Sequence, residues 1–268
     1  MKLPLVLKGD LIFHFVLEDE ITGNGSLLCL EAGYKADAAI IIDGTRSNRS
    51  INQHAGNMQF NVTVLGKPVS VSVSHIGVNP VEVIAELLLN VKKQILRMNA
   101  KRTGAWRNFP SPFQLIIQEL QSKAVTTSLP ESAQAQCYAT FPPPLTVAKI
   151  QGLLMKEAER MRKENPGAEI EFHWDCLAVD PVMGGGSELE SALQACAKRL
   201  GMEPIGIGPS TGSSDMRHFI ETGIPCLLYG PGNGFNPHRP NEHYYLSDLP
   251  RMILFYLALA EKWCGRAA

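Results

Sequence analysis

Several features that mark particular protein classes are missing from this sequence of 268 residues. It has no block of like charges, and 25 Lys and Arg residues nearly balance 26 Asp and Glu residues. This balance argues against binding to nucleic acid or to a membrane surface, which usually needs a basic excess. The six cysteines stand singly without a CxxC pair. They favour small buried thiols in a reducing cytosol over a disulfide framework or a Cys-type zinc site.

The N-terminus lacks the pattern of a signal peptide or of a membrane span. Its apolar run, in MKLPLVLKGD, is short and is broken by Pro4 and Lys8. No internal repeat or low-complexity tract is present either. Because 45% of the residues are hydrophobic, the chain can bury a sizeable core. We therefore expect a cytoplasmic globular protein.

Two apolar segments near the N-terminus end in acidic residues. Residues 10–17 (DLIFHFVL) predict a buried strand, and three acids follow at residues 18–20. Residues 38–42 predict a second strand that ends at Asp43, and a helix is expected between the two, over residues 26–34. Strands joined in this way are usually parallel, so their acids should meet at one edge of the sheet, where ligands bind in such folds.

The middle of the chain has a different pattern, which predicts a separate domain of the order β-α-β-β-α-β, the ferredoxin-like arrangement. Its expected strands are residues 57–66, 113–120, 135–141 and 168–174, and its expected helices are residues 79–97 and 147–163. Alternating helices and strands then resume, as in a parallel sheet with flanking helices. These helices are residues 189–200, 215–221 and 249–263, and the strands are residues 205–208 and 224–229.

We therefore predict an α/β fold with an insertion. A parallel-sheet catalytic domain should comprise residues 1–50 and 177–268, and the inserted α+β domain should comprise residues 51–176. Three segment ends of the first domain offer Glu20, Asp43 and His238, whose carboxylates and imidazole are good ligands for Zn²⁺. Each could also be an ordinary turn, cap or loop residue.

Several stretches, taken in order, resemble the dizinc amidohydrolase and metallopeptidase family that includes acetylornithine deacetylase, succinyl-diaminopimelate desuccinylase and glutamate carboxypeptidase. They are LKGDLIFHFVLEDEITGNGS, GYKADAAIIIDGT, SSDMRHF and GIPCLLYGPGNGFNPHRPNE. The stretch GKPVSVSVSHIGVNPVEVIAELL is similar to the start of that family's lid or dimerisation domain. The resemblance implies a hydrolase that uses two zinc ions to cleave an amide bond in an N-acyl amino acid or small peptide. It also implies a homodimer formed through the lid.

The resemblance further implies roles for individual residues. Asp19 falls at the general base, which takes a proton from the attacking water. Glu20 and His238 fall at ligands of one zinc ion, and Asp43 falls at a ligand of the other. Four more positions fall in the segments that bind substrate or shape the loop before His238: Asp215, Arg217, Gly230 and Gly232. An arginine there suits a substrate carboxylate, because a guanidinium binds carboxylates bidentately.

The sequence also departs from the family. The family's first section, which carries a His ligand and the Asp that bridges both ions, has no counterpart before residue 8. Asp19 is one methylene shorter than the family's Glu, and Ser70 stands where the family often has a His. We therefore expect an incomplete zinc site, in a sequence that is either an N-terminally truncated reading of a longer gene or a diverged remnant. Either should expose a sheet edge and apolar helix faces.

Two other functions stay open at this point. The first is a catalytically inactive, truncated homologue that acts as a binding or dimerisation protein. The second is a serine hydrolase, because four hydroxyl residues precede Asp215 and His218 between residues 210 and 214. This second function has little support, since the sequence has no GxSxG elbow.

Overall fold

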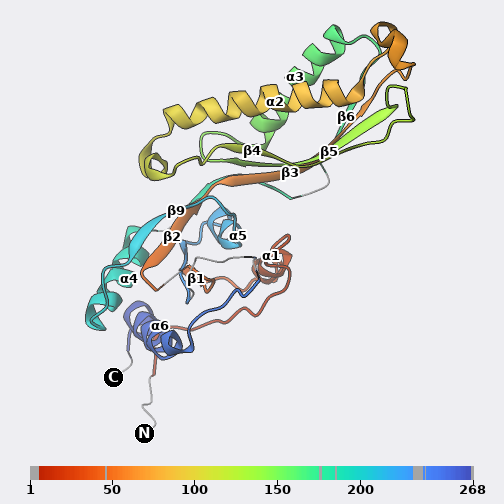
Figure 1. The fold of residues 1–268 in the computed structure, drawn as a ribbon. Helices are drawn as coiled ribbons and strands as arrows, with labels where there is room; N and C mark the ends of the chain where they lie inside the picture. Colours follow the sequence, from red (N-terminus) through yellow and green to blue (C-terminus); the bar gives the residue numbers. More distant parts are fainter. Residues whose placement is uncertain are drawn as a thin grey trace. The chain divides into compact units, whose positions relative to one another are not determined.

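The structure is a computed structural model. It describes residues 6–45, 47–174, 177–184, 186–231, 238 and 240–266. The chain forms two compact units (Figure 1). Unit 1 comprises Met1–His54, Val182–Ser210 and Ser214–Ala268, and unit 2 comprises Ala55–Pro181 and Thr211–Ser213.

Unit 2 is an antiparallel sheet with two long helices on one face (Figure 1). Its strands lie in the spatial order β4-β5-β3-β6, and the short β7 also pairs with β3. The elements are β3 (Gly56–Leu65), α2 (Pro80–Met98), β4 (Gln114–Ser122), β5 (Ser132–Phe141), α3 (Val147–Glu164), β6 (Glu169–His173) and β7 (Ala178–Val179). Three 3₁₀ helices complete it: η1 (Val71–Ile76), η2 (Asn99–Lys101) and η3 (Gly104–Asn108). The order β-α-β-β-α-β predicted for this region is therefore present.

The sequence pattern explains why unit 2 folds in this way. Alternate residues of β3 point to the core, and the side chains of Phe60, Val62 and Val64 are fully buried there. The helix α2 presents its apolar stripe to the same core. It begins at Pro80 after Asn79, whose side chain accepts the N–H of Val81 at 3.1 Å.

Unit 1 contains a mixed sheet, in the order β1-β10-β2-β8 with β9 also paired to β2. The pairs β1–β10 and β2–β9 are parallel, whereas β10–β2 and β2–β8 are antiparallel. Its elements are α1 (Asn24–Glu31), β1 (Ala39–Ile41), β2 (Arg49–His54), β8 (Val182–Met183), α4 (Ser187–Arg199), β9 (Gly206–Ser210), α5 (Met216–Glu221), β10 (Cys226–Leu228), η4 (Leu246–Asp248) and α6 (Leu249–Cys264).

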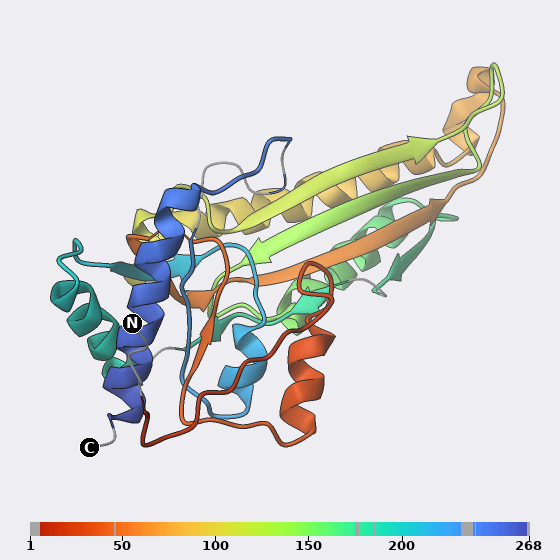
Figure 2. The same ribbon diagram turned by 90° about the horizontal axis from the view of Figure 1, so that it is seen from below.

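The prediction of a parallel sheet is therefore wrong for unit 1. The strand β2 was not expected, and the described residues that connect it to β1 contain no crossover helix. A strand parallel to β1 would need such a crossover. The strand β2 therefore runs antiparallel to β1, and so also antiparallel to β10, which is parallel to β1. The helices α4 and α6 pack against each other, as do α1 and α5, which lie side by side in Figure 2.

The predicted strand at residues 10–17 is also wrong, because the described chain has no ladder there. Phe13, Phe15 and Leu17 are 63%, 93% and 81% exposed. A strand needs a neighbour to pair with its N–H and C=O groups, and β1 pairs only with β10 among the described strands. The parallel strand–helix–strand unit is therefore not formed here.

Candidate metal and substrate site

The acid turn, residues 18–23, is held in shape by its own hydrogen bonds. The carbonyl oxygen of Glu18 accepts the backbone N–H groups of residues 21–23 at 2.9–3.1 Å. The Glu18 carboxylate accepts the hydroxyl of Thr22 at 2.5 Å and the side-chain amide of Asn24 at 3.2 Å. Glu18 has a φ of 65°, in the left-handed region that residues with a side chain seldom adopt. The bonds thus maintain an unfavourable backbone conformation that fixes how the acids are presented.

Asp19 lies in an acidic environment built from distant parts of unit 1. Burial raises the pKa of the Asp19 carboxyl, and three neighbouring carboxylates raise it further. They belong to Asp215, Asp43 and Glu20. The charge of Arg217 partly offsets them and lowers the pKa. A carboxyl whose pKa is raised by burial and by charge is a candidate for proton transfer.

Asp43 and Gly230 lie against each other at the ends of β1 and β10. A β-carbon on Gly230 would lie 2.2 Å from the carbonyl oxygen of Asp43. The hydroxyl of Thr45 accepts the N–H of Gly230 at 3.1 Å and donates to its carbonyl oxygen at 3.3 Å. The Asp43 carboxylate accepts the N–H of Gly44 at 2.5 Å. Only glycine fits at 230; the predicted Gly232 lies outside the described residues.

Glu20 and His238 come together although 217 residues separate them in sequence. Nδ1 of His238 lies 3.7 Å from Oε2 of Glu20, and both side chains are more than 70% exposed. The backbone N–H of His238 donates to the carboxylate of Glu242 at 3.0 Å. Two ligands of one tetrahedral zinc ion lie about 3.4 Å apart, given bonds of roughly 2.0–2.1 Å. The pair therefore has nearly the spacing of two zinc ligands.

The donors fit zinc in kind but not in number. Carboxylate oxygen and imidazole nitrogen are common zinc ligands, and catalytic zinc has three protein ligands with one open position. In the part of the chain that the structure describes, no group of three His, Cys, Asp or Glu residues is placed to hold a metal ion. Glu20 and His238 thus form an incomplete site, with Asp43 nearby in the same acidic environment.

Asp215 lies just before α5 and is only 2% exposed. Its Oδ2 accepts the hydroxyl of Ser26 at 2.7 Å, and a β-carbon on Gly23 would lie 2.0 Å from its Oδ1. Gly23 has a φ of 68° and starts α1, so glycine is needed there for conformation and for space. The roles of Ser26 and Gly23 were not predicted from the sequence. Their only signal was the turn before the helix, which says nothing about a contact with a residue near position 215.

Arg217 connects the acid turn to α5. Its guanidinium donates to the carbonyl oxygens of Thr22 and of Ser214, the latter at 3.1 Å. The side chain is buried, and burial lowers the pKa of Arg217, while the carboxylates of Asp215 and Glu221 act in the opposite direction. Arg217 is therefore part of the interior of unit 1, and it holds the backbone on which Asp19 and Glu20 stand.

The segment 214–218 concentrates buried polar atoms. Among the described residues, Oγ of Ser214, Oδ1 of Asp215 and Nε2 of His218 are buried without a hydrogen-bond partner. Most buried polar atoms in proteins are paired, so a run of three is unusual. It marks this segment as a candidate for chemistry or recognition.

Replacing His218 by phenylalanine is expected to reduce the fall in unfolding free energy that the protein shows as the pH becomes acidic. Burial lowers the pKa of His218, and the charge of Arg217 lowers it further. Because the unfolded state then binds the proton more readily, wild-type stability should fall as the pH drops below about 6.5. Urea unfolding at pH 5 and pH 7.5 measures the difference. The exposed His75→Phe serves as control, and an equal reduction in both variants would contradict the assignment.

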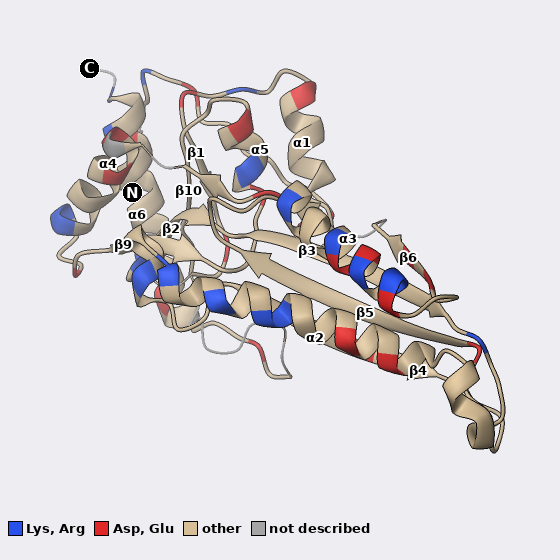
Figure 3. Ribbon diagram, turned by 90° about the horizontal axis from the view of Figure 1, so that it is seen from above, with Lys and Arg blue, Asp and Glu red and all other residues tan. Residues whose placement is uncertain are grey.

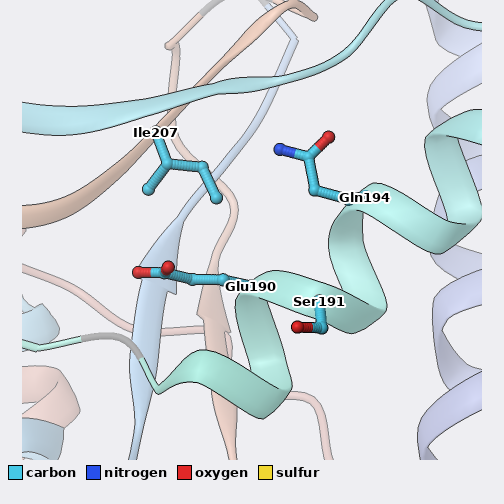
Figure 4. Close-up of a pocket in the computed structure, with 4 residues that line it drawn as sticks. All are labelled: Glu190, Ser191, Gln194 and Ile207. Carbon is cyan, nitrogen blue, oxygen red and sulfur yellow. The ribbon is translucent and has the colours of Figure 1, made fainter.

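Two surface hollows lie elsewhere in unit 1. One, of about 530 Å³, is lined by Glu190, Ser191 and Gln194 of α4 and by Ile207 of β9 (Figure 4). Glu190 already accepts the amide of Asn52 at 2.9 Å, and Gln194 bonds the backbone of residue 205. The second shares Ile207. None of the predicted site residues lines either hollow.

Comparison with known proteins identifies the lineage. Residues 2–262 match the model of peptidase family M20/M25/M40. N-formyl-4-amino-5-aminomethyl-2-methylpyrimidine deformylase of Bacillus subtilis (strain 168) is 24% identical over 293 aligned positions, covering 97% of this chain and 66% of that protein. Succinyl-diaminopimelate desuccinylase of Alkalilimnicola ehrlichii is also 24% identical, covering 78% of this chain and 52% of that protein. The chain thus spans no more than two thirds of either relative.

Solved structures show the same fold. A tripeptidase from Staphylococcus aureus aligns with a TM-score of 0.72 and 16% identity, over 92% of this chain and 62% of that chain. A dinuclear metal-binding peptidase from Bacillus subtilis aligns with a TM-score of 0.64 and 17% identity, over 94% and 65%. In the described part of the chain, no helix has the length and apolar character needed to cross a membrane. The resemblance drawn from the sequence is confirmed: this chain belongs to peptidase family M20/M25/M40.

Proposed function

We propose that this chain takes part in the metal-dependent hydrolysis of an amide bond in an N-acyl amino acid or small peptide. The observation that carries the proposal is the meeting of Glu20 with His238 beside the acidic environment of Asp19 and Asp43. The names of relatives that remove formyl and succinyl groups support an N-acyl substrate. Unit 1 would carry the chemistry, and unit 2 would serve as the lid or dimerisation domain.

Individual residues take the following roles in this proposal. Glu20 and His238 would hold one zinc ion, and Asp43 would contribute to a second. A bound divalent ion makes water a better nucleophile and polarises a carbonyl group. The Asp19 carboxylate would accept the proton of the attacking water, which its raised pKa favours. Asp215 and Arg217 would support the substrate pocket from the interior of unit 1, while Gly230 and Gly232 would shape the loop that leads to His238.

A second function is favoured by the incomplete donor set. In the described part of the chain, two side chains at a single ion leave it one ligand short of a catalytic zinc site. A homologue with such a site could bind a metal or an acylated ligand, or dimerise, without turnover. We keep this non-catalytic function as the alternative.

The cysteines support a reducing, cytoplasmic location. Five of the six, those in the described part of the chain, form no disulfide.

The experiment that separates the two functions is a hydrolysis assay on the purified chain. It is incubated with Zn²⁺ and with an N-succinyl amino acid, an N-formyl amino acid or a tripeptide, and the released amine is measured. Hydrolysis that disappears on chelation and returns with Zn²⁺ would support the enzyme. Zinc binding without release of amine, in the parent and in the Asp19→Asn variant alike, would support the non-catalytic function.

We also propose that two copies of the chain associate through unit 2. β4 lies at the edge of its sheet and pairs only with β5 among the described strands, so nine residues have a free side. On α2, Leu89 and Leu96 are 47% and 40% exposed. Figure 3 shows acidic residues toward the start of α2 and basic residues toward its end. Two antiparallel copies of α2 would therefore place opposite charges side by side.

The double variant Leu89→Glu/Leu96→Glu is expected to convert such a dimer to monomers, because it places like charges in an apolar seam. Sedimentation velocity over a range of concentrations measures the change. Met155→Glu is the matched control, since Met155 is also partly exposed, at 43%, but lies on α3. A parent that sediments as a monomer, or a control that dissociates equally, would contradict association through α2.

A further inference from the structure

Asn57, at the start of β3, makes an unusually complete set of hydrogen bonds for a side-chain amide. It is fully buried, and its Nδ2 lies within donating distance of the carbonyl oxygens of Gly56 (2.9 Å) and Thr211 (3.1 Å) and of the Thr140 hydroxyl (3.3 Å). Its Oδ1 accepts the backbone N–H of Ser213 at 2.9 Å. A buried polar group with this many partners defines one local arrangement.

Two of these bonds fix a short segment that comes from far away in the sequence. The segment Thr211–Ser213, here called the strap, belongs to unit 2, whereas the residues on both sides of it belong to unit 1. Asn57 holds the strap at both ends, through the carbonyl of Thr211 and the N–H of Ser213. No regular secondary structure pins the strap itself.

The strap leads directly into the candidate site. Ser214 follows it, and the carbonyl oxygen of Ser214 accepts a bond from Arg217 at 3.1 Å. The same guanidinium donates to the carbonyl oxygen of Thr22, inside the acid turn. A continuous path of bonds thus runs from Asn57 through the strap and Arg217 to the turn that bears Asp19 and Glu20.

We propose that Asn57 is a positioning residue, which fixes the strap and, through Arg217, the acid turn. Its importance to catalysis rests on the proposed function, in which the acid turn carries a metal ligand and the general base. The role explains why an amide is present at a buried position of a strand: alanine could pack there but could bond neither end of the strap. The role also gives a reason for the burial of Arg217, whose guanidinium joins Ser214, next to the strap, to Thr22 in the acid turn.

Hydrogen–deuterium exchange of the full chain, resolved to short peptides, tests this role without metal or substrate. In Asn57→Ala, amides of residues 211–217 and of the acid turn should exchange about tenfold faster, as expected for loss of a buried hydrogen bond. Arg217→Met should accelerate the acid turn but leave the N–H of Ser213 protected. Thr140→Val is the matched control, since it removes one partner of Asn57 and leaves the strap bonds; it should change neither region more than about twofold.

Two results would overturn the role. One is faster exchange of the strap with an unchanged acid turn, which would make Asn57 a local clamp only. The other is uniform acceleration across β5 and α2, which would make it a general stability residue. If Asn57→Ala does not fold, Asn57→Ser is used, because its shorter hydroxyl cannot span both bonds. The result is independent of zinc binding, so failure of the proposed function and failure of this role are distinguished.

Discussion

Alanine at Glu20 or at His238 is expected to lower the zinc affinity of this chain by about 100-fold or more. Even outer partners of a zinc ligand are worth roughly 10–100-fold in affinity, and these two residues would be ligands themselves. Because the two donors lie 3.7 Å apart and a third is not placed with them in the described part, losing either leaves a single ligand. Isothermal titration with Zn²⁺ at neutral pH, together with bound metal per chain, measures the effect.

His243→Ala is the control for this titration. His243 is an exposed imidazole five residues beyond His238, so removing it tests whether any nearby histidine suffices. It should leave zinc affinity within about twofold of the parent, since it is outside the pair. Equal losses in all three variants would indicate nonspecific binding by surface residues. Unchanged affinity after loss of Glu20 and His238 would place the metal elsewhere.

Gly230→Ala is expected to destabilise unit 1 by about 3 kcal/mol, the upper part of the usual range for overpacking. The added β-carbon would lie 2.2 Å from the carbonyl oxygen of Asp43 and 2.7 Å from its carbonyl carbon. These are backbone atoms, which cannot rotate away as a flexible side chain can. The change should therefore separate the ends of β1 and β10 and displace Asp43. Urea denaturation gives the loss of unfolding free energy.

Gly208→Ala supplies the matched comparison. Neither glycine has a positive φ, and a β-carbon on Gly208 would meet nothing within 4 Å. The two variants thus have the same chemistry but differ in available space. Gly208→Ala should change stability by less than about 1 kcal/mol. If Gly230→Ala proves equally mild, the close approach of Asp43 and Gly230 is not maintained in solution.

The sequence predicted the fold of unit 2 better than the fold of unit 1. In unit 2, each strand and helix carries its own pattern, such as the alternation along β3 and the apolar stripe of α2. Those elements were therefore placed correctly from local information. In unit 1, the run at residues 10–17 has the composition of a strand yet pairs with nothing described. Conversely, β2 (RSINQH) is polar and was missed, because partners on both sides make it a strand.

The candidate site shows the same division. The order of its motifs determined the lineage, because the matching stretches run along nearly the whole chain, and residue types alone named Glu20, Asp43 and His238 as donors. Only the tertiary structure decided that Glu20 meets His238, that Gly23 and Ser26 pack on Asp215, and that Arg217 is buried. Local patterns report how a segment folds, whereas these contacts join residues about 190 to 220 positions apart. Their distances depend on packing, which no local pattern records.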